Sequence, residues 1–245
     1  QGIAQQASIA IENSRLVARI EQEALTRQKF EKMLSPNLVE RVLSGELQIA
    51  KGGNIRTVTC MFTDIRGFTS LSEKTSAEDL IRMLNEYFEI LVDVIFEYEG
   101  TVDKFIGDAV MAVWSAPVEV QEAERKAIEA AVKIQKAMET FNTVRSMDGL
   151  APINTGIGVA SGEVVAGYVG SSKTMSYTVI GDCVNLASRL CTIASAGEIC
   201  VTGHAYHAYG GADIFKGVEM EPIKLKGITE PVSYWSIEGF LETGD

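Results

Sequence analysis

The sequence predicts an α+β fold: a ferredoxin-like βαββαβ core with additional C-terminal strands and a helix, preceded by an N-terminal α-helical coiled coil. Three observations lead to this prediction. Short apolar, β-branched runs alternate with longer segments of helical spacing from about residue 56 to residue 201. Glycine-containing turn signals separate these segments. Heptad spacing occupies the first 34 residues.

The N-terminal segment, residues 1–34, contains no proline and no glycine after Gly2. Alternating steps of four and three residues connect Ile9, Asn13, Leu16, Ile20, Glu23, Arg27, Phe30 and Leu34. This narrow seam predicts a parallel two-stranded coiled coil, and a single amphipathic helix packed on its own domain is the alternative. Pro36 ends the helix, and residues 35–51 are expected to form a transducing linker.

The main domain is expected over residues 52–240 and begins with a strand near 56–64. A helix starting near Thr75 follows, with Thr75 and Glu78 as a capping box. The remaining elements are a hairpin over 101–113 that turns at Gly107-Asp108, a helix from Glu119 to about Val144, glycine-punctuated strands over 154–170, a strand over 175–180, a helix over 182–193 capped by Asp182, and a strand over 197–201.

Composition limits the classes of function. With 245 residues, 46% of them hydrophobic, the chain can fill a core. A net charge of −11 and a pI near 4.8 argue against a nucleic-acid-binding surface. The sequence has no run of about 18 apolar residues and no visible signal peptide, so no membrane segment is predicted. Its four cysteines form no CxxC pair, which favours a reducing, cytoplasmic location. The chain begins with Gln inside an apparent helix, which is typical of a fragment of a longer protein.

Two aspartates, Asp64 and Asp108, stand at the ends of apolar strands. A β-α-β-β order can make the first strand and the hairpin neighbours, and this would bring the two carboxylates together. Two carboxylates that close repel each other unless a cation lies between them. An open site with few oxygen ligands suits Mg²⁺ or Mn²⁺ carrying a phosphate. Each Asp taken alone can also be explained as an ordinary turn residue.

Further positions suit an anionic ligand. The turn Gly67-Phe68-Thr69 can offer backbone N–H groups to phosphate oxygens. Asn185 and Arg189 are four residues apart in the first two turns of a predicted helix, where the helix terminus favours anions. An acidic protein needs such local devices to bind a nucleotide.

Three blocks of the sequence resemble the class III nucleotidyl cyclases, specifically the bacterial adenylyl cyclase catalytic domain. The blocks are FTDIRGFTSLSE, DKFIGDAVMAVW and GVASGEVVAGYVGSSKTMSYTVIGDCVNLASRL, and the resemblance covers about residues 52–240. Residues 1–22 resemble the last helix of a GAF sensor domain. Residues 28–46 resemble the transducing segment that precedes many such cyclase domains.

The resemblance implies an enzyme that converts ATP into 3′,5′-cyclic AMP and pyrophosphate. Asp64, Asp108 and the backbone carbonyl of Ile65 would hold two Mg²⁺ or Mn²⁺ ions. Lys104 and Thr178 would select adenine, since lysine donates to N1 and threonine accepts from the 6-amino group.

The remaining roles also follow from the resemblance. Asn185 would orient the ribose, and Arg189 would stabilise charge on the α-phosphate. Lys226 would contact the terminal phosphates, with Lys224 as a rival. Some relatives carry an arginine on the strand near 154–157 that touches the triphosphate, and none occurs there in this sequence.

In the family the sites are shared between two catalytic domains. One subunit gives the metal ligands, and the other gives the base-selecting, ribose and phosphate residues. A head-to-tail homodimer held in register by the N-terminal coil, with a sensor domain upstream, is therefore implied. Two alternatives remain: a guanylyl cyclase, which would need an acceptor such as Glu at position 104, and a catalytically silent domain that binds nucleotide and regulates.

Overall fold

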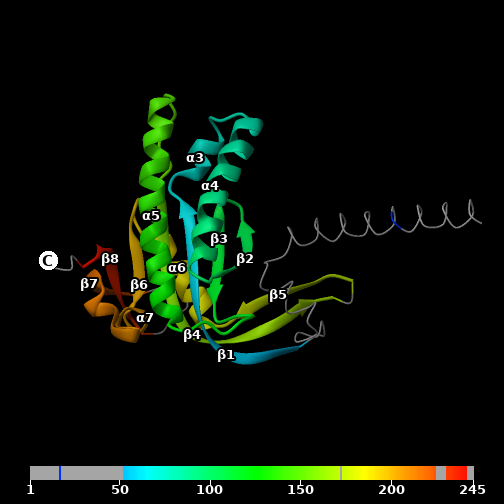
Figure 1. Cartoon of the computed structure of the whole chain (residues 1–245), viewed down its shortest axis with the longest axis vertical. Helices are drawn as coiled ribbons and strands as arrows, with labels where there is room; N and C mark the ends of the chain where they lie inside the picture. The colour runs from blue at the N-terminus through cyan, green and yellow to red at the C-terminus, as the bar shows by residue number, and fades with distance from the viewer. Residues whose placement is uncertain (1–16, 18–51, 172, 225–229, 242–245) are drawn as a thin grey trace, which may run out of the picture. The chain divides into compact units, whose positions relative to one another are not determined.

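The computed structural model describes residue 17 and residues 52–171, 173–224 and 230–241. The part from residue 52 onward is an eight-stranded sheet with helices on both faces (Figure 1). Its elements in chain order are β1 (Gly52–Ile65), α3 (Phe68–Ser72), α4 (Ala77–Glu97), β2 (Thr101–Ile106), β3 (Ala109–Trp114), α5 (Ala123–Met147), β4 (Thr155–Gly170), β5 (Met175–Ile180), α6 (Asp182–Ile193), β6 (Ile199–Thr202), α7 (Gly203–His207), a 3₁₀ turn (Ala208–Asp213), β7 (Phe215–Ile223) and β8 (Val232–Phe240).

The strand order confirms the α+β prediction. The strands lie in the order β2-β3-β1-β4-β6-β8-β7, and β5 pairs with β4 outside this path. The first four are the strands of a βαββαβ unit, and all of their pairings are antiparallel. Strand β6 joins β4 in parallel, so the sheet is mixed. The order places the end of β1 beside the β2–β3 turn.

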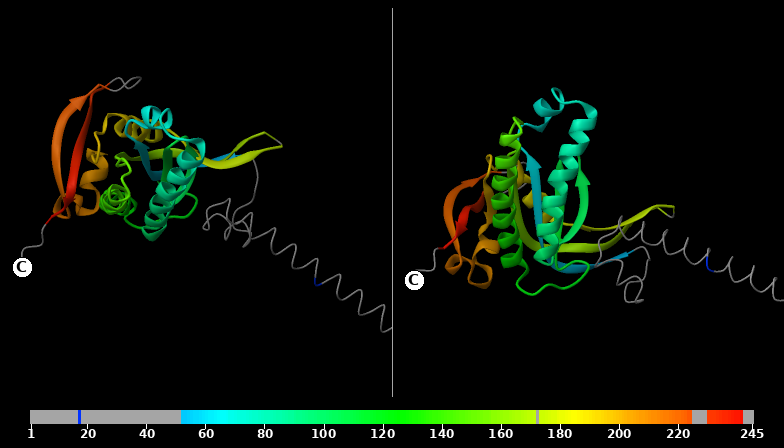
Figure 2. Two further views of the ribbon diagram at one scale, coloured as in Figure 1. Left: turned by 90° about the horizontal axis from the view of Figure 1, so that it is seen from above. Right: turned by 45° about the horizontal axis from the view of Figure 1, so that its top comes forward.

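Helices cover both faces of the sheet (Figure 2), and each face has a separate core. Helices α4 and α5 cover one face, where Met61 of β1 packs in the same cluster as Tyr87 and Ile128. Helix α6 covers the other face, where Cys60 packs in the same cluster as Cys183. Successive residues of a strand point to opposite faces, which explains why neighbouring residues of β1 enter different cores.

Several element boundaries differ from the sequence predictions. Strand β1 begins at Gly52, because its first half pairs with β4 and gains backbone partners that the glycine-rich sequence does not reveal. Helix α4 is capped one residue later than predicted: the Oγ of Ser76 accepts from the N–H of Asp79 at 3.2 Å. The predicted capping pair, Thr75 with Glu78, is therefore wrong.

The start of α5 also differs. The helix begins at Ala123 and not at Glu119, because a loop precedes it in which the Ser115 hydroxyl bonds both the carbonyl and the N–H of Val120 at 3.2 Å. The glycine-rich segment over 154–170 is one continuous strand, not several.

Other predictions concern the chain as a whole. The coiled coil, the sensor helix and the linker (residues 1–34 and 35–51) lie outside the described residues, apart from Val17. All four cysteines are buried, free thiols, as the lack of a CxxC pair suggested. None of the helices in the described part of the chain combines the length and apolar composition that crossing a membrane requires.

Candidate active site

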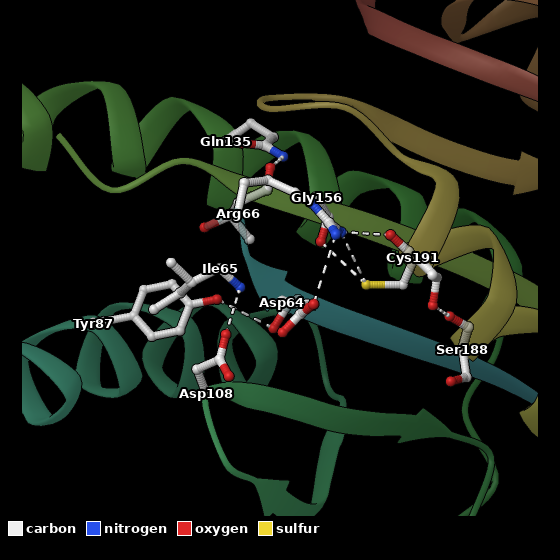
Figure 3. Close-up of polar contacts among 12 residues, drawn as sticks. Asp64, Ile65, Arg66, Tyr87, Asp108, Gln135, Gly156, Ser188 and Cys191 are labelled. Carbon is white, nitrogen blue, oxygen red and sulfur yellow. Dashed lines mark hydrogen bonds and ion pairs between the residues drawn. The ribbon is translucent and has the colours of Figure 1, made fainter. Parts of the chain in front are cut away.

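The structure brings the two predicted aspartates together. Asp64 is the penultimate residue of β1, and Asp108 lies in the turn between β2 and β3. Strand β1 pairs with β3 up to Thr63, opposite Val110, which aligns the two strand ends. The backbone N–H of Ile65 donates to Asp108 Oδ2 at 3.1 Å, and the two carboxylates face each other across this contact (Figure 3).

The proximity of the carboxylates changes their acidity. Burial, together with the neighbouring Asp108 carboxyl, raises the pKa of Asp64 to about 6. Arg66, whose Nη1 lies 3.6 Å from Asp64 Oδ2, opposes this rise only in part. A pair of partly exposed carboxylates with one unusually weak acid could hold a hard divalent cation, which would relieve the repulsion.

Arg66 is a member of the site that the sequence reasoning missed. Its guanidinium donates to the carbonyl of Cys191 near the end of α6, and Nη2 lies 3.6 Å from the Cys191 sulfur (Figure 3). The same guanidinium covers Gly156 of β4, where a Cβ would lie only 2.2 Å from Nη2. An arginine guanidinium therefore does lie against the strand near 154–157, and it comes from Arg66, the residue that follows β1. The available signal was a glycine in a strand, which can mark a close approach.

A second cluster joins β2 to β5. Lys104 Nζ donates to Thr178 Oγ1 at 3.1 Å, so the structure places the predicted base-selecting residues in direct contact. Asp103, a residue the sequence reasoning passed over, accepts from the Thr178 hydroxyl at 2.9 Å. The pairing of β2 with β3 is irregular between Val102 and Lys104. Such a bulge can re-aim side chains, which explains how two successive residues both reach Thr178.

Helix α6 carries the predicted ribose and phosphate residues. Its buried side is formed by Cys183, Ala187, Leu190 and Cys191. Asn185 is exposed and Arg189 is half-buried, so both lie away from that side. Gly181 is the N-cap, and the helix has no side-chain capping bond. Asp182 is the first residue of the helix, so the prediction of Asp182 as N-cap is wrong.

The remaining predicted contacts lie in turns. Gly67 has a φ of 73° and precedes the short helix α3, so Phe68 and Thr69 occupy its first turn. Helical first-turn N–H groups have no partner within their own helix. Lys226 lies outside the described residues, and Lys224 is exposed just beyond β7.

The described part of the chain is thus a mixed-sheet α+β domain in which one polar cluster is acidic and another pairs a lysine with a threonine. The chain belongs to the adenylate and guanylate cyclase catalytic domain family, whose model matches residues 51–239. It is 33% identical over 223 aligned positions to an adenylate cyclase of Anabaena cylindrica, and the match covers 88% of this chain and 42% of that protein. It is 41% identical over 133 residues to adenylate cyclase 1 of Rhizobium meliloti, which are 54% of this chain and 20% of that protein.

Solved structures of nucleotide cyclases also resemble this chain. The guanylyl cyclase Cya2 is 34% identical with a TM-score of 0.73, and the match covers 78% of this chain and 96% of that one. The adenylyl cyclase CyaB from P. aeruginosa is 32% identical with a TM-score of 0.72, and the match covers 75% and 94%. The chain thus spans less than half the length of the two curated relatives but nearly all of these two solved domains.

Proposed function

We propose that this domain is an adenylyl cyclase, which converts ATP into 3′,5′-cyclic AMP and pyrophosphate. The observation that carries the proposal is the contact between Lys104 and Thr178, at 3.1 Å. A lysine ammonium can only donate, which suits N1 of adenine, whereas guanine presents an N1–H there. The Thr178 oxygen can accept from the adenine 6-amino group.

Overall similarity does not choose between the two bases. A guanylyl cyclase at 34% identity and an adenylyl cyclase at 32% resemble this chain almost equally well. Specificity has to be argued from the side chains that meet the base, because a site built to hydrogen-bond one group strongly rejects an analogue that cannot match it.

The acidic cluster is the place for metal ions. Asp64, Asp108 and the backbone carbonyl of Ile65 would hold Mg²⁺ or Mn²⁺, and the pKa of Asp64, which burial and the neighbouring Asp108 carboxyl raise to about 6, fits a cation at this position. When bound, such ions supply Lewis-acid activation of the ribose 3′-hydroxyl and neutralise the triphosphate.

The other residues orient the nucleotide. Asn185 positions the ribose, and Arg189 stabilises the charge on the α-phosphate as the 3′-oxygen attacks and pyrophosphate leaves. The N–H groups of Gly67, Phe68 and Thr69 and the side chain of Lys226 bind the remaining phosphate oxygens. These roles come from family resemblance, and the placement of Asn185 and Arg189 off the buried side of α6 supports them.

The active form is proposed to be a head-to-tail homodimer in which each site takes its metal ligands from one subunit and its other residues from the partner. Large apolar side chains remain exposed on β1, β2, β4 and β5, as expected of a surface that pairs with a second copy: Ile55, Phe105, Ile106, Val165, Val169 and Ile180. The N-terminal segment would hold the two chains in parallel and connect them to an upstream sensor.

The test is nucleotide turnover by the purified chain with Mn²⁺ and then Mg²⁺, supplied with ATP or GTP over a range of protein concentrations. We expect cyclic AMP as the main product and a rate that rises faster than linearly with concentration. Cyclic GMP as the main product would identify a guanylyl cyclase. No product from a folded, dimeric protein would identify a silent regulatory domain.

A paired variant tests the base pocket itself. Lys104→Glu combined with Thr178→Cys should shift the preference from ATP toward GTP, because the glutamate accepts from the guanine N1–H. Loss of ATP turnover without any such shift would contradict the assignment of these two residues.

A further inference from the structure

Asp103 is a buried carboxylate that has no role in the reaction described so far. Its side chain is only 6% exposed, although it belongs to a β2 strand whose other residues are at least partly accessible. Its Oδ2 lies 2.9 Å from Thr178 Oγ1 and 3.2 Å from Lys104 Nζ. A buried carboxylate is costly unless it is hydrogen-bonded. Here its partners are the two side chains assigned to the base.

The chemistry of the three groups fixes the direction of each hydrogen bond. An ionised carboxylate can only accept, and a lysine ammonium can only donate. The single proton of the Thr178 hydroxyl must therefore point to Asp103, while its oxygen accepts from Lys104. A hydroxyl oxygen has two lone pairs, so one remains for a ligand. Thr178 can offer that ligand an acceptor but not a donor.

We propose that Asp103 is a positioning residue that holds the Thr178 hydroxyl as an acceptor and thereby makes the pocket select a 6-amino purine over a 6-oxo purine. The adenine 6-amino group would donate to the free lone pair. The guanine O6 would instead meet a second acceptor and gain no bond. This inference rests on the proposed function, since it assumes that Lys104 and Thr178 meet the base.

Without the carboxylate, the direction in which the Thr178 hydroxyl donates is no longer fixed. In an Asp103→Ala variant the Thr178 hydroxyl is free to rotate, and it can donate to the guanine O6 as readily as it accepts from an amino group. The loss of one directed hydrogen bond changes discrimination by about tenfold. We therefore expect the ratio of kcat/KM for ATP to kcat/KM for GTP to fall by about tenfold, with GTP turnover rising and not merely ATP turnover falling.

A matched control keeps the acceptor. The Asp103→Asn variant retains a carbonyl oxygen of the same size, and the two donors around it, Thr178 and Lys104, orient that oxygen toward themselves. Its ATP-to-GTP ratio should stay within about threefold of the wild-type ratio. If burial of the charge were the only role of Asp103, both variants would lower ATP and GTP turnover in the same proportion.

A double-mutant cycle separates positioning from packing. Thr178→Val removes the hydroxyl that Asp103 is proposed to orient. In that background Asp103→Ala should leave the ATP-to-GTP ratio unchanged, even where it lowers the melting temperature. A similar change of the ratio in both backgrounds would show that Asp103 acts through another group.

The experiment measures cyclic nucleotide formation from ATP and GTP for the wild type, the two Asp103 variants and the Thr178→Val pair, with dimer state and thermal unfolding recorded for each. Competition of ATP and GTP against a fluorescent nucleotide gives the same ratio from binding alone. If Asp103→Ala does not fold, Asp103→Leu, which fills the space of the carboxylate, takes its place.

The outcomes are distinguishable. ATP preference in the wild type that falls in Asp103→Ala and survives in Asp103→Asn supports the inference. ATP preference that is unchanged in Asp103→Ala overturns the role of Asp103 and leaves the proposed function intact. A wild type that prefers ATP neither in turnover nor in binding overturns the proposed function, and the inference with it.

Discussion

Replacing Asp64 with asparagine removes one of the two facing carboxylates and should make the metal-free protein more stable while it destroys the enzyme. The pKa of Asp64 is raised from 3.8 to about 6 by burial and by Asp108. At 1.36 kcal/mol for each tenfold change in acidity, this rise corresponds to about 3 kcal/mol. The side chain is 37% exposed, so solvent screening reduces the effect to about 1 kcal/mol.

The sign follows from proton binding. Because the folded protein holds this proton more tightly than the unfolded chain, the stability linked to Asp64 is fully present below pH 3.8 and is lost as the pH rises through about 6. The neutral Asp64→Asn variant does not lose this stability as the pH rises, because its amide does not ionise. Its melting temperature without metal should exceed that of the wild type by about 2–4 °C at pH 7.5, and the difference should shrink toward pH 4.

Thermal unfolding at several pH values, with and without Mn²⁺, checks this reasoning. Bound Mn²⁺ should raise the melting temperature of the wild type, because a ligand that binds only the folded state stabilises it. The variant should lose this increase together with its cyclase activity. Asp93→Asn, on the exposed part of α4, is the matched control and should change nothing.

Two results would refute the argument. An unchanged or lower melting temperature of the metal-free variant at pH 7.5 would show that the folded protein does not disfavour the ionised form of Asp64. Full turnover by the variant would remove Asp64 from the metal site altogether.

Two further predictions concern the glycines of β4 and the buried thiols. Gly156→Ala places a Cβ 2.2 Å from the movable guanidinium of Arg66 and should reduce turnover at least tenfold with little loss of stability. Gly158→Ala places a Cβ 2.2 Å from the α6 backbone and should destabilise the domain by about 3 kcal/mol. Equal melting temperatures of the two variants would contradict this difference. All four cysteines are buried, and burial raises the pKa of Cys191 and Cys200 to about 12. A thiol reagent at pH 8 should therefore label the native protein slowly and label all four thiols at once in denaturant. Fast labelling of the native protein would show that the thiols are accessible.

The amino-acid sequence alone predicted most of the helices and strands and the pair of aspartates, Asp64 and Asp108. Side chains repeat every two residues along a strand and every 3.6 residues along a helix. The apolar pattern therefore predicts β1, the β2–β3 hairpin, α4 and α6 with small errors at their ends. The alternation of these elements implies that β1 and the hairpin are neighbours, and Asp64 and Asp108 therefore meet as expected. The family motifs added the donor–acceptor pair, and the heptad prediction for residues 1–34 stays a prediction.

The surroundings of those residues depend on tertiary contacts that the sequence pattern does not reveal. Arg66 reaches Cys191, 125 residues away, because Gly156 leaves room for its guanidinium. Asp103 reaches Thr178, 75 residues away, because β2 bulges and the fold brings the Thr178 side chain of β5 within hydrogen-bonding distance, although the two strands do not pair. A local pattern records which face a side chain takes in a regular strand. It does not record a bulge, a missing Cβ, or the partner that folding brings from a distant part of the chain.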